Sequence, residues 1–170
     1  MSEEKKQNPW WKDLLEIVIT VAVLSFVILH FILLPVEVDG SSMYPTLVDG
    51  QRGYSFIIKK TLGVDRFDIA VIEESEDKLL VKRVIGMPNE TVEFRNNILY
   101  INGEETPQDF LNEDVYTEDF SVELGDDEYF MMGDNRGVSR DSRYYGPFSL
   151  EDIRSTGIFI FYPFDQFGMK

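Results

Sequence analysis

The sequence Ile-Val-Ile-Thr-Val-Ala-Val-Leu-Ser-Phe-Val-Ile-Leu-His-Phe-Ile-Leu-Leu-Pro-Val occupies residues 17–36 and divides the chain into two unequal parts. Its only polar residues are Thr20, Ser25 and His30. About 20 apolar residues in a helix cover the ~30 Å hydrocarbon core of a bilayer. A cleaved signal peptide has a shorter apolar region, of roughly 7–15 residues, and ends in a small-x-small pattern that is absent here. The stretch therefore predicts one uncleaved transmembrane helix.

The charges on the two sides of this apolar run indicate its orientation. Three lysines lie within residues 1–16, whereas acidic residues follow the run from Glu37 onward. Positively charged flanks of membrane helices stay on the cytoplasmic side. We therefore expect residues 1–16 to be a cytoplasmic segment, residues 17–36 a single-pass anchor in the cell membrane, and residues 37–170 an extracytoplasmic domain.

The part after the anchor is expected to be mainly β. Its short apolar segments are bounded by charged or glycine-containing turns, as strands are. Residues 91–94 and 98–101 flank Arg95-Asn96-Asn97, which indicates a β-hairpin. We expect an antiparallel sheet or barrel-like domain, preceded by one transmembrane helix. The predicted strands are residues 53–58, 68–73, 79–85, 91–94, 98–101, 128–132 and 157–161.

Two segments of this domain lack a strand pattern. Residues 106–127 are acidic and show no clear alternation, so we expect a long loop or irregular segment there. Residues 149–154 are expected to form a single helical turn.

Composition excludes several classes of function. The chain has 31 acidic and 16 basic residues, a formal net charge of −15. Nucleic-acid binding relies on cationic side chains, so we expect no nucleic-acid partner. There is no cysteine, and the acidic clusters lack the spacing of a calcium loop, so we expect no metal and no other cofactor. The single histidine lies inside the apolar run, so the outer domain cannot contain a Ser-His-Asp triad.

Lys82 is a candidate general base. In a strand it shares one face with Leu80 and Val84, both apolar. Burial favours a neutral amine, and a base that works near neutrality needs its pKa about 3 units below ~10.4, a difference of roughly 4 kcal/mol. The pattern by itself also fits an edge-strand lysine whose ammonium group reaches water.

Ser41 and Ser42 lie in a Gly-Ser-Ser turn before Pro45 and are candidate nucleophiles. A serine nucleophile needs a base within hydrogen-bond reach and donors for the oxyanion. Because no histidine is available, lysine is the available strong base, as in the Ser-Lys variant of serine proteases. The residues alone do not choose between the two serines.

A third segment, residues 133–143, is dense in Asp, Asn, Arg, Ser and Gly. It fits a surface loop joined by Asp-Arg pairs. It equally fits a wall of an active site, in which one hydroxyl orients the lysine and an Asp-Arg pair fixes the wall.

Together these segments resemble the conserved boxes of bacterial type I signal peptidases, in the compact Gram-positive form. Residues 42–47 (Ser-Met-Tyr-Pro-Thr-Leu) are similar to the nucleophile box, which indicates Ser42 rather than Ser41. Residues 82–86 (Lys-Arg-Val-Ile-Gly) are similar to the general-base box, and residues 133–143 to the last box.

The resemblance implies a membrane-bound serine endopeptidase with a Ser-Lys dyad. Its partners would be membrane lipid and signal-peptide-bearing preproteins with small residues before the cleaved bond. Ser42 would be the nucleophile, Lys82 the base, and the Ser42 backbone N–H an oxyanion donor. Some relatives have a serine where this chain has Gly40, so a second donor would have to come from the main chain.

Further roles follow from the same resemblance. Ser139 would hydrogen-bond the lysine, and Asp141 and Arg143 would form a supporting ion pair, with Asp134 and Arg136 nearby. The pockets for small substrate residues would be lined by Val38, Met43, Leu47 and Val81. Two positions depart from the family pattern, because Phe67 replaces a usual glycine and Gly137 a frequent aspartate.

Two other functions compete with this interpretation. One is a tethered β domain that binds peptides without cutting them, against which the joint presence of Ser42, Lys82, Ser139 and Asp141 argues. The other is a self-cleaving Ser-Lys protease with a nucleic-acid-binding or cytoplasmic partner domain, which neither the anchor nor the negative charge favours.

Overall fold

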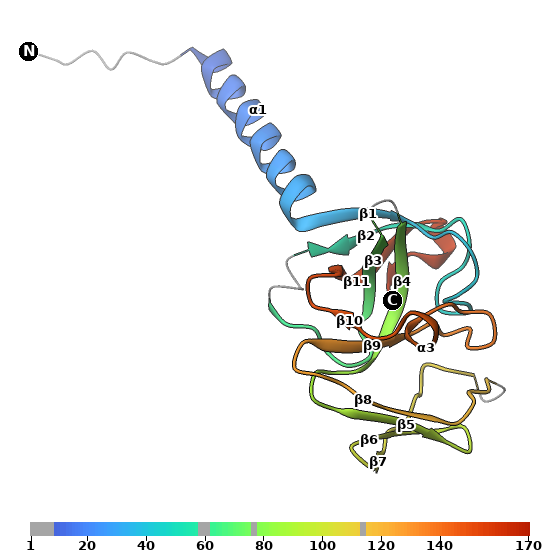
Figure 1. The fold of residues 1–170 in the computed structure, drawn as a ribbon. Helices are drawn as coiled ribbons and strands as arrows, with labels where there is room; N and C mark the ends of the chain where they lie inside the picture. The colour runs from blue at the N-terminus through green and yellow to red at the C-terminus, as the bar shows by residue number, and fades with distance from the viewer. Residues whose placement is uncertain (1–8, 58–61, 76–77, 113–114) are drawn as a thin grey trace, which may run out of the picture.

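The computed structural model describes residues 9–57, 62–75, 78–112 and 115–170. One helix projects from a body made of two antiparallel β-sheets (Figure 1). The predicted fold class, mainly β with one N-terminal apolar helix, is confirmed. The first half of the predicted cytoplasmic segment, residues 1–8, and the end of the strand predicted at residues 53–58 lie outside the described residues.

The helix begins earlier and ends earlier than the apolar run suggested. α1 (Trp10–Val27) continues into the π-helical turn η1 (Ile28–Ile32). Together they span 23 residues, long and apolar enough to cross a membrane. The most apolar 18-residue window within them has a mean hydropathy of 2.5, and none of that window is buried against the body. The start extends because Lys12, Leu14, Leu15 and Glu16 have good helical propensity.

The last residues of the predicted anchor form a strand instead. β1 (Leu33–Glu37) pairs with β2 (Arg52–Phe56) and is an edge of its sheet. Pro35 has no backbone N–H and cannot continue a helix, but an edge strand tolerates it. The polypeptide therefore passes from the helix into the β body without a linker.

The larger sheet carries most of the body. Its strand order is β1-β2-β11-β3-β4-β9-β10, and β12 pairs with β11. The turn predicted at residues 149–154 is present but shorter: the Asp152 N–H donates to the Ser149 carbonyl and the Ile153 N–H to that of Leu150. Ser149 itself ends β10, and Ile153 begins β11, where it pairs with Ile72. Long-range pairing outweighs a weak local preference there. The remaining elements are β3 (Ile69–Ser75), β4 (Lys78–Gly86), β9 (Glu128–Met132), α3 (Ser142–Tyr145), β10 (Phe148–Ser149), β11 (Ile153–Tyr162), η2 (Phe164–Gln166) and β12 (Gly168–Met169).

The smaller sheet, of order β7-β6-β5-β8, lies at the end of the body remote from α1 (Figure 1). The predicted hairpin is confirmed: β5 (Thr91–Arg95) and β6 (Ile98–Ile101) are joined through Asn96 and Asn97, both at positive φ. The segment predicted to be a long loop contains β8 (Phe120–Glu123), which pairs with β5. Only two apolar residues alternate in β8, too few to indicate a strand from sequence. β7 (Glu104–Glu105) completes this sheet.

An apolar cluster between the larger sheet and the segment after β1 positions the functional residues. Val38, Met43 and Leu47 are buried from that segment, and they pack with side chains of β3 and β11. Their burial holds residues 38–47, with Ser42 among them, against the sheet.

Candidate active site

Lys82 is held in the middle of the sheet. It pairs with Ala70 of β3, and only 2% of its surface is exposed. Burial lowers the pKa of its amine to about 8; the negative charge of Asp141 opposes this and the positive charge of Lys78 adds to it. Of the two alternatives that the strand pattern left open, the structure has the buried lysine, in a strand that is not at the sheet edge, and a substantial neutral fraction exists near pH 8.

Ser42 lies within hydrogen-bond distance of this amine. Lys82 Nζ donates to Ser42 Oγ over 2.9 Å and to the carbonyl of Val81 over 2.9 Å. The neighbouring Ser41 is exposed, whereas Met43 beside it is buried. Among the described residues, the hydroxyl that meets the lysine is the one that the family pattern indicated.

Gly133 lets the third segment approach Ser42 closely. A Cβ on Gly133 would lie less than 3.0 Å from both the Ser42 carbonyl oxygen and the Ser139 hydroxyl. The Gly133 N–H donates to Asp141 over 2.9 Å, and the Asn135 N–H donates to the Ser42 carbonyl over 3.0 Å. Residues 133–135 thus pack against the backbone of Ser42, which only glycine at position 133 allows.

Asp141 and Arg143 form a two-pronged ion pair behind this contact. Arg143 Nε and Nη2 donate to the two carboxylate oxygens over 2.9 and 2.8 Å, and Asp141 is fully buried. Burial alone would raise the pKa of Asp141, but the hydrogen bonds from Arg143 and from the Gly133 N–H outweigh it and hold that pKa below its usual value. The carboxylate stays ionised and fixes the position of Gly133.

Ser139 does not make the hydrogen bond to Lys82 that the family resemblance implied. Its hydroxyl is buried and makes no hydrogen bond of good geometry with any described residue. It lies near enough to Asp141 to help lower the pKa of that carboxyl. Ser139 fills the space that Gly133 leaves, close to the site but not bonded to the amine.

Sequence reasoning missed a second ion pair beside the site. Arg83 Nε and Nη2 donate to Asp134 over 2.9 and 2.6 Å, and Thr46 Oγ1 donates to the same carboxylate over 2.5 Å. Arg83 lies on the face of β4 opposite to Lys82, which it shares with Val81 and Ile85. That face is apolar as well, and a buried arginine there requires an anionic partner, which is the signal that could have indicated the pair.

Arg136 lies near Asp134 but bonds elsewhere. Its guanidinium donates to the carbonyl of Gly133 and to the side chains of Thr117 and Gln108, over 3.1, 3.0 and 2.5 Å. Burial lowers the pKa of Arg136 to about 10. This arginine connects residues 106–117 to the third segment.

The two departures from the family pattern have different structural settings. Phe67 has φ 70°, a conformation that glycine adopts more readily, which accounts for glycine as the usual residue there. Its ring packs on Phe110, and its carbonyl accepts a hydrogen bond of 2.8 Å from Arg83. Gly137 is exposed, with open space where a Cβ would lie.

Ser42 and Lys82 face a cleft of about 190 Å³ between the β1 region and β4. Val38, Met43 and Val81 line it, as the resemblance implied, together with Gly40. Leu47 does not line it but is buried beneath it. Gly40 has φ 89°, and its N–H donates to Asp49 over 2.7 Å, so that N–H is already engaged.

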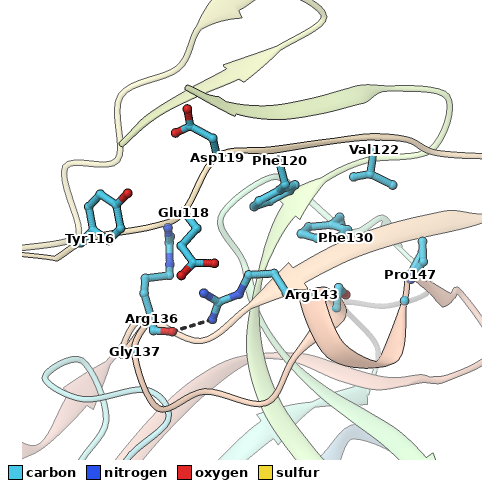
Figure 2. A pocket seen from close by; sticks show the side chains of 12 residues that line it. Tyr116, Glu118, Asp119, Phe120, Val122, Phe130, Arg136, Gly137, Arg143 and Pro147 are labelled. Atoms are coloured by element: carbon cyan, nitrogen blue, oxygen red, sulfur yellow. Dashed lines mark hydrogen bonds between the residues drawn. The ribbon is translucent and has the colours of Figure 1, made fainter. Parts of the chain in front are cut away.

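A larger cavity, of about 610 Å³, lies apart from this cleft. Figure 2 shows Phe120 and Phe130 close together on one side of it, with their rings tilted by 35°, and Arg136 and Arg143 on the other. The dashed contact is the hydrogen bond of 2.8 Å from Arg143 to the Arg136 carbonyl. Neither Ser42 nor Lys82 lines this cavity.

The arrangement in the smaller cleft suits nucleophilic attack on a carbonyl group. A hydroxyl hydrogen-bonded to an amine with a pKa of about 8 can lose its proton to that amine while it attacks. The apolar residues of its lining suit a short apolar segment of substrate. The chemistry that this geometry permits is acyl transfer to a serine.

Comparisons with known proteins point to one family. The model of the family described as signal peptidase, peptidase S26, matches residues 11–162. The chain is 41% identical to signal peptidase I S of Bacillus subtilis, over 98% of this chain and 95% of that protein. It is 35% identical to signal peptidase IB of Staphylococcus aureus, over 92% and 93%. The crystal structure of a signal peptidase I from Enterococcus faecalis matches with a TM-score of 0.50 and 32% identity, covering 55% of this chain and 95% of that one.

Proposed function

Because the chain belongs to the signal peptidase family, peptidase S26, and is a serine endopeptidase, we propose that it removes signal peptides from exported preproteins with a Ser42-Lys82 dyad. The observation that carries this proposal is the 2.9 Å hydrogen bond between the buried Lys82 amine and Ser42 Oγ. A buried lysine without an ion pair is costly to fold, and general-base catalysis is a reason to retain it.

The proposed reaction proceeds through an ester. Neutral Lys82 accepts the Ser42 proton while Ser42 Oγ bonds to the carbonyl carbon of the substrate and the carbonyl π electrons move to oxygen. The Ser42 N–H stabilises this oxyanion. The intermediate collapses, the C–N bond breaks, and the Lys82 ammonium protonates the leaving amine. Water then attacks the ester with Lys82 again as base, which releases the signal peptide and restores Ser42.

The proposal extends to the placement of the protein. The helix Trp10–Ile32 would cross the cell membrane, surrounded by lipid, with the segment that precedes it cytoplasmic and the β body extracytoplasmic. β1 starts immediately after this helix and lines the cleft with residues 35–37. A preprotein whose signal segment lies in the same bilayer would therefore emerge beside the cleft.

The size of the cleft supports a preference for small residues. Its volume of about 190 Å³ and its walls of Val38, Met43 and Val81 leave room for short side chains before the cleaved bond. A bulky side chain would have to displace buried residues such as Met43, which packs in the core.

The test is cleavage of a signal-bearing preprotein by the full chain in detergent micelles. We expect the wild type and Ser41→Ala to cut after a small-x-small site, and Ser42→Ala and Lys82→Ala to be inert. If the wild type bound a range of preproteins but left them intact, the protein would be a peptide-binding module. If Lys82→Ala still cut at the wild-type rate, the lysine would not be the base.

A further inference from the structure

Asn135 forms a hydrogen bond to the peptide group that links Ser41 and Ser42; the acceptor is the Ser41 carbonyl oxygen. Its side-chain Nδ2 donates to the Ser41 carbonyl oxygen over 3.1 Å, and its backbone N–H donates to the Ser42 carbonyl over 3.0 Å. The orientation of the side-chain amide is defined, because a carbonyl acceptor requires the NH₂ end. One residue therefore contacts two successive carbonyl groups of the nucleophile turn.

The contact to Ser41 determines where the Ser42 N–H points. The Ser41 carbonyl and the Ser42 N–H belong to the same planar peptide unit, which is trans, so they point in opposite directions. Rotation of this peptide plane would turn the Ser42 N–H away from the position at which it could donate to a substrate oxyanion. The other donor to the Ser41 carbonyl is the Tyr44 N–H, over 3.1 Å, and it belongs to the same turn. Asn135 therefore provides a hydrogen bond to the Ser41 carbonyl from outside the turn.

Asn135 is itself well fixed. Its carbonyl accepts the N–H groups of Val138 and Ser139 over 3.2 and 3.0 Å, which closes the turn of the third segment. Two residues before it, Gly133 is tied to the buried Asp141. Because Asn135 is fixed, its side-chain amide can hold the Ser42 N–H in position before the substrate reacts. Oxyanion stabilisation is effective when the donors are already oriented in this way.

We propose that Asn135 is a positioning residue for the oxyanion hole: its side-chain amide orients the Ser41–Ser42 peptide so that the Ser42 N–H meets the oxyanion. This inference rests on the proposed function, in which that N–H is an oxyanion donor. The residue does not touch the substrate, and it acts only through the backbone of Ser42. Its loss should weaken transition-state binding and leave substrate binding unchanged.

The variants that test this are Asn135→Ala, which removes the amide, and Asn135→Asp, which keeps the shape but replaces the donor by an acceptor. Asn112→Ala is the matched control, since Asn112 is an exposed asparagine that does not line the cleft. Kinetics are measured with the full chain in micelles, well above the Lys82 pKa of about 8, so that the base is neutral in every variant.

Removal of a complete oxyanion donor lowers kcat by about 100- to 1,000-fold, and a misdirected donor should cost less. We expect Asn135→Ala to lower kcat by roughly 10- to 100-fold, Asn135→Asp to lower it further, and KM to stay within about twofold. A peptide aldehyde, to which Ser42 adds to form a tetrahedral adduct, should lose affinity by the same factor as kcat/KM. A peptide with a reduced, uncleavable bond should bind all variants equally.

The outcomes separate this inference from the proposed function. If the wild type cuts but Asn135→Ala keeps the wild-type kcat and aldehyde affinity, the inference is wrong and the proposed function stands. Equal loss of affinity for the aldehyde and for the reduced peptide would also overturn it, because a general loosening of the cleft has that effect. Absence of cleavage by the wild type would instead reject the proposed function.

Discussion

Arg83 and Asp134 face each other as a buried ion pair, with two hydrogen bonds of 2.9 and 2.6 Å, on the side of β4 opposite to Lys82. The pair joins the strand that carries the lysine to the segment that packs on Ser42. Thr46 bonds to the same carboxylate and links the nucleophile segment to it. Three segments far apart in sequence therefore meet at one carboxylate.

Asp134→Asn should destabilise the protein strongly. Removal of one partner leaves the Arg83 charge buried and uncompensated, which costs about 3–5 kcal/mol. Urea unfolding of the full chain in micelles measures this. The control is Glu37→Gln, which breaks the exposed Arg52–Glu37 pair and should cost less than about 1 kcal/mol. Similar decreases in the free energy of unfolding for both variants would show that the buried Arg83–Asp134 pair contributes no more to stability than the exposed Arg52–Glu37 pair.

Gly133→Ala should abolish most activity. The added methyl group would lie under 3.0 Å from the Ser139 hydroxyl and the Ser42 carbonyl. Ser139 has a side chain that can rotate, but the carbonyl belongs to the backbone of Ser42, so Ser42 would move relative to Lys82. We expect kcat to fall by about 100-fold or more, as for other ångström-scale misplacements.

Gly137→Ala is the matched control for this substitution. A Cβ at Gly137 meets no atom within 4 Å, and φ there is not positive. Its cleavage rate should equal that of the wild type. Comparable losses in the two variants would mean that chain flexibility, rather than the close approach to Ser42, explains the requirement for glycine.

The rate of cleavage should rise with pH through about 8. Lys82 acts as a base only when neutral, and below its pKa of about 8 the neutral fraction falls about tenfold per pH unit. The positive charge of Lys78 lowers the pKa of Lys82, so Lys78→Gln should move the midpoint of kcat/KM to higher pH, and less so in high salt. A profile that is flat between pH 6 and 9, or a midpoint that moves downward, would contradict this assignment.

Lys82→Met should be inactive yet more stable. Displacement of the lysine pKa from 10.5 to about 8 corresponds to about 3 kcal/mol of cost for the charged form, which the methionine removes. Between pH 8 and 10.5 the unfolded state still holds a proton that the folded state has lost, so the free energy of unfolding of the wild type rises with pH. The advantage of the variant should therefore be up to about 3 kcal/mol below pH 8 and shrink above it.

Lys78→Met controls for the removal of a lysine from the same strand. The Lys78 side chain is half-exposed beside Glu74, and its replacement should give no gain in stability. Unfolding is followed by urea titration at several pH values. An advantage of Lys82→Met that does not depend on pH would show that packing, and not the buried charge, is its source.

The sequence by itself determined the features that depend on local pattern. The apolar run predicted the helix, and Asn96 and Asn97 between two apolar strands predicted the β5–β6 turn. The apolar neighbours of Lys82 on its strand fitted a buried amine but also an exposed one, and the tertiary structure decided between them. The motif around Ser42 selected it over Ser41. These features depend on neighbouring residues, and their physical causes are hydrophobic burial, backbone conformation and side-chain chemistry.

Only the tertiary structure decided which distant residues meet. Asp134 is 51 positions from Arg83 and 88 from Thr46, and no local period relates them. Asn135 and the Ser41 carbonyl, 94 positions apart, are likewise related by no local period. Nor does the local sequence show that Leu47 is buried beneath the cleft and does not line it. Strand pairing and close packing bring such groups together, because each strand satisfies its hydrogen bonds with partners that the local sequence does not specify.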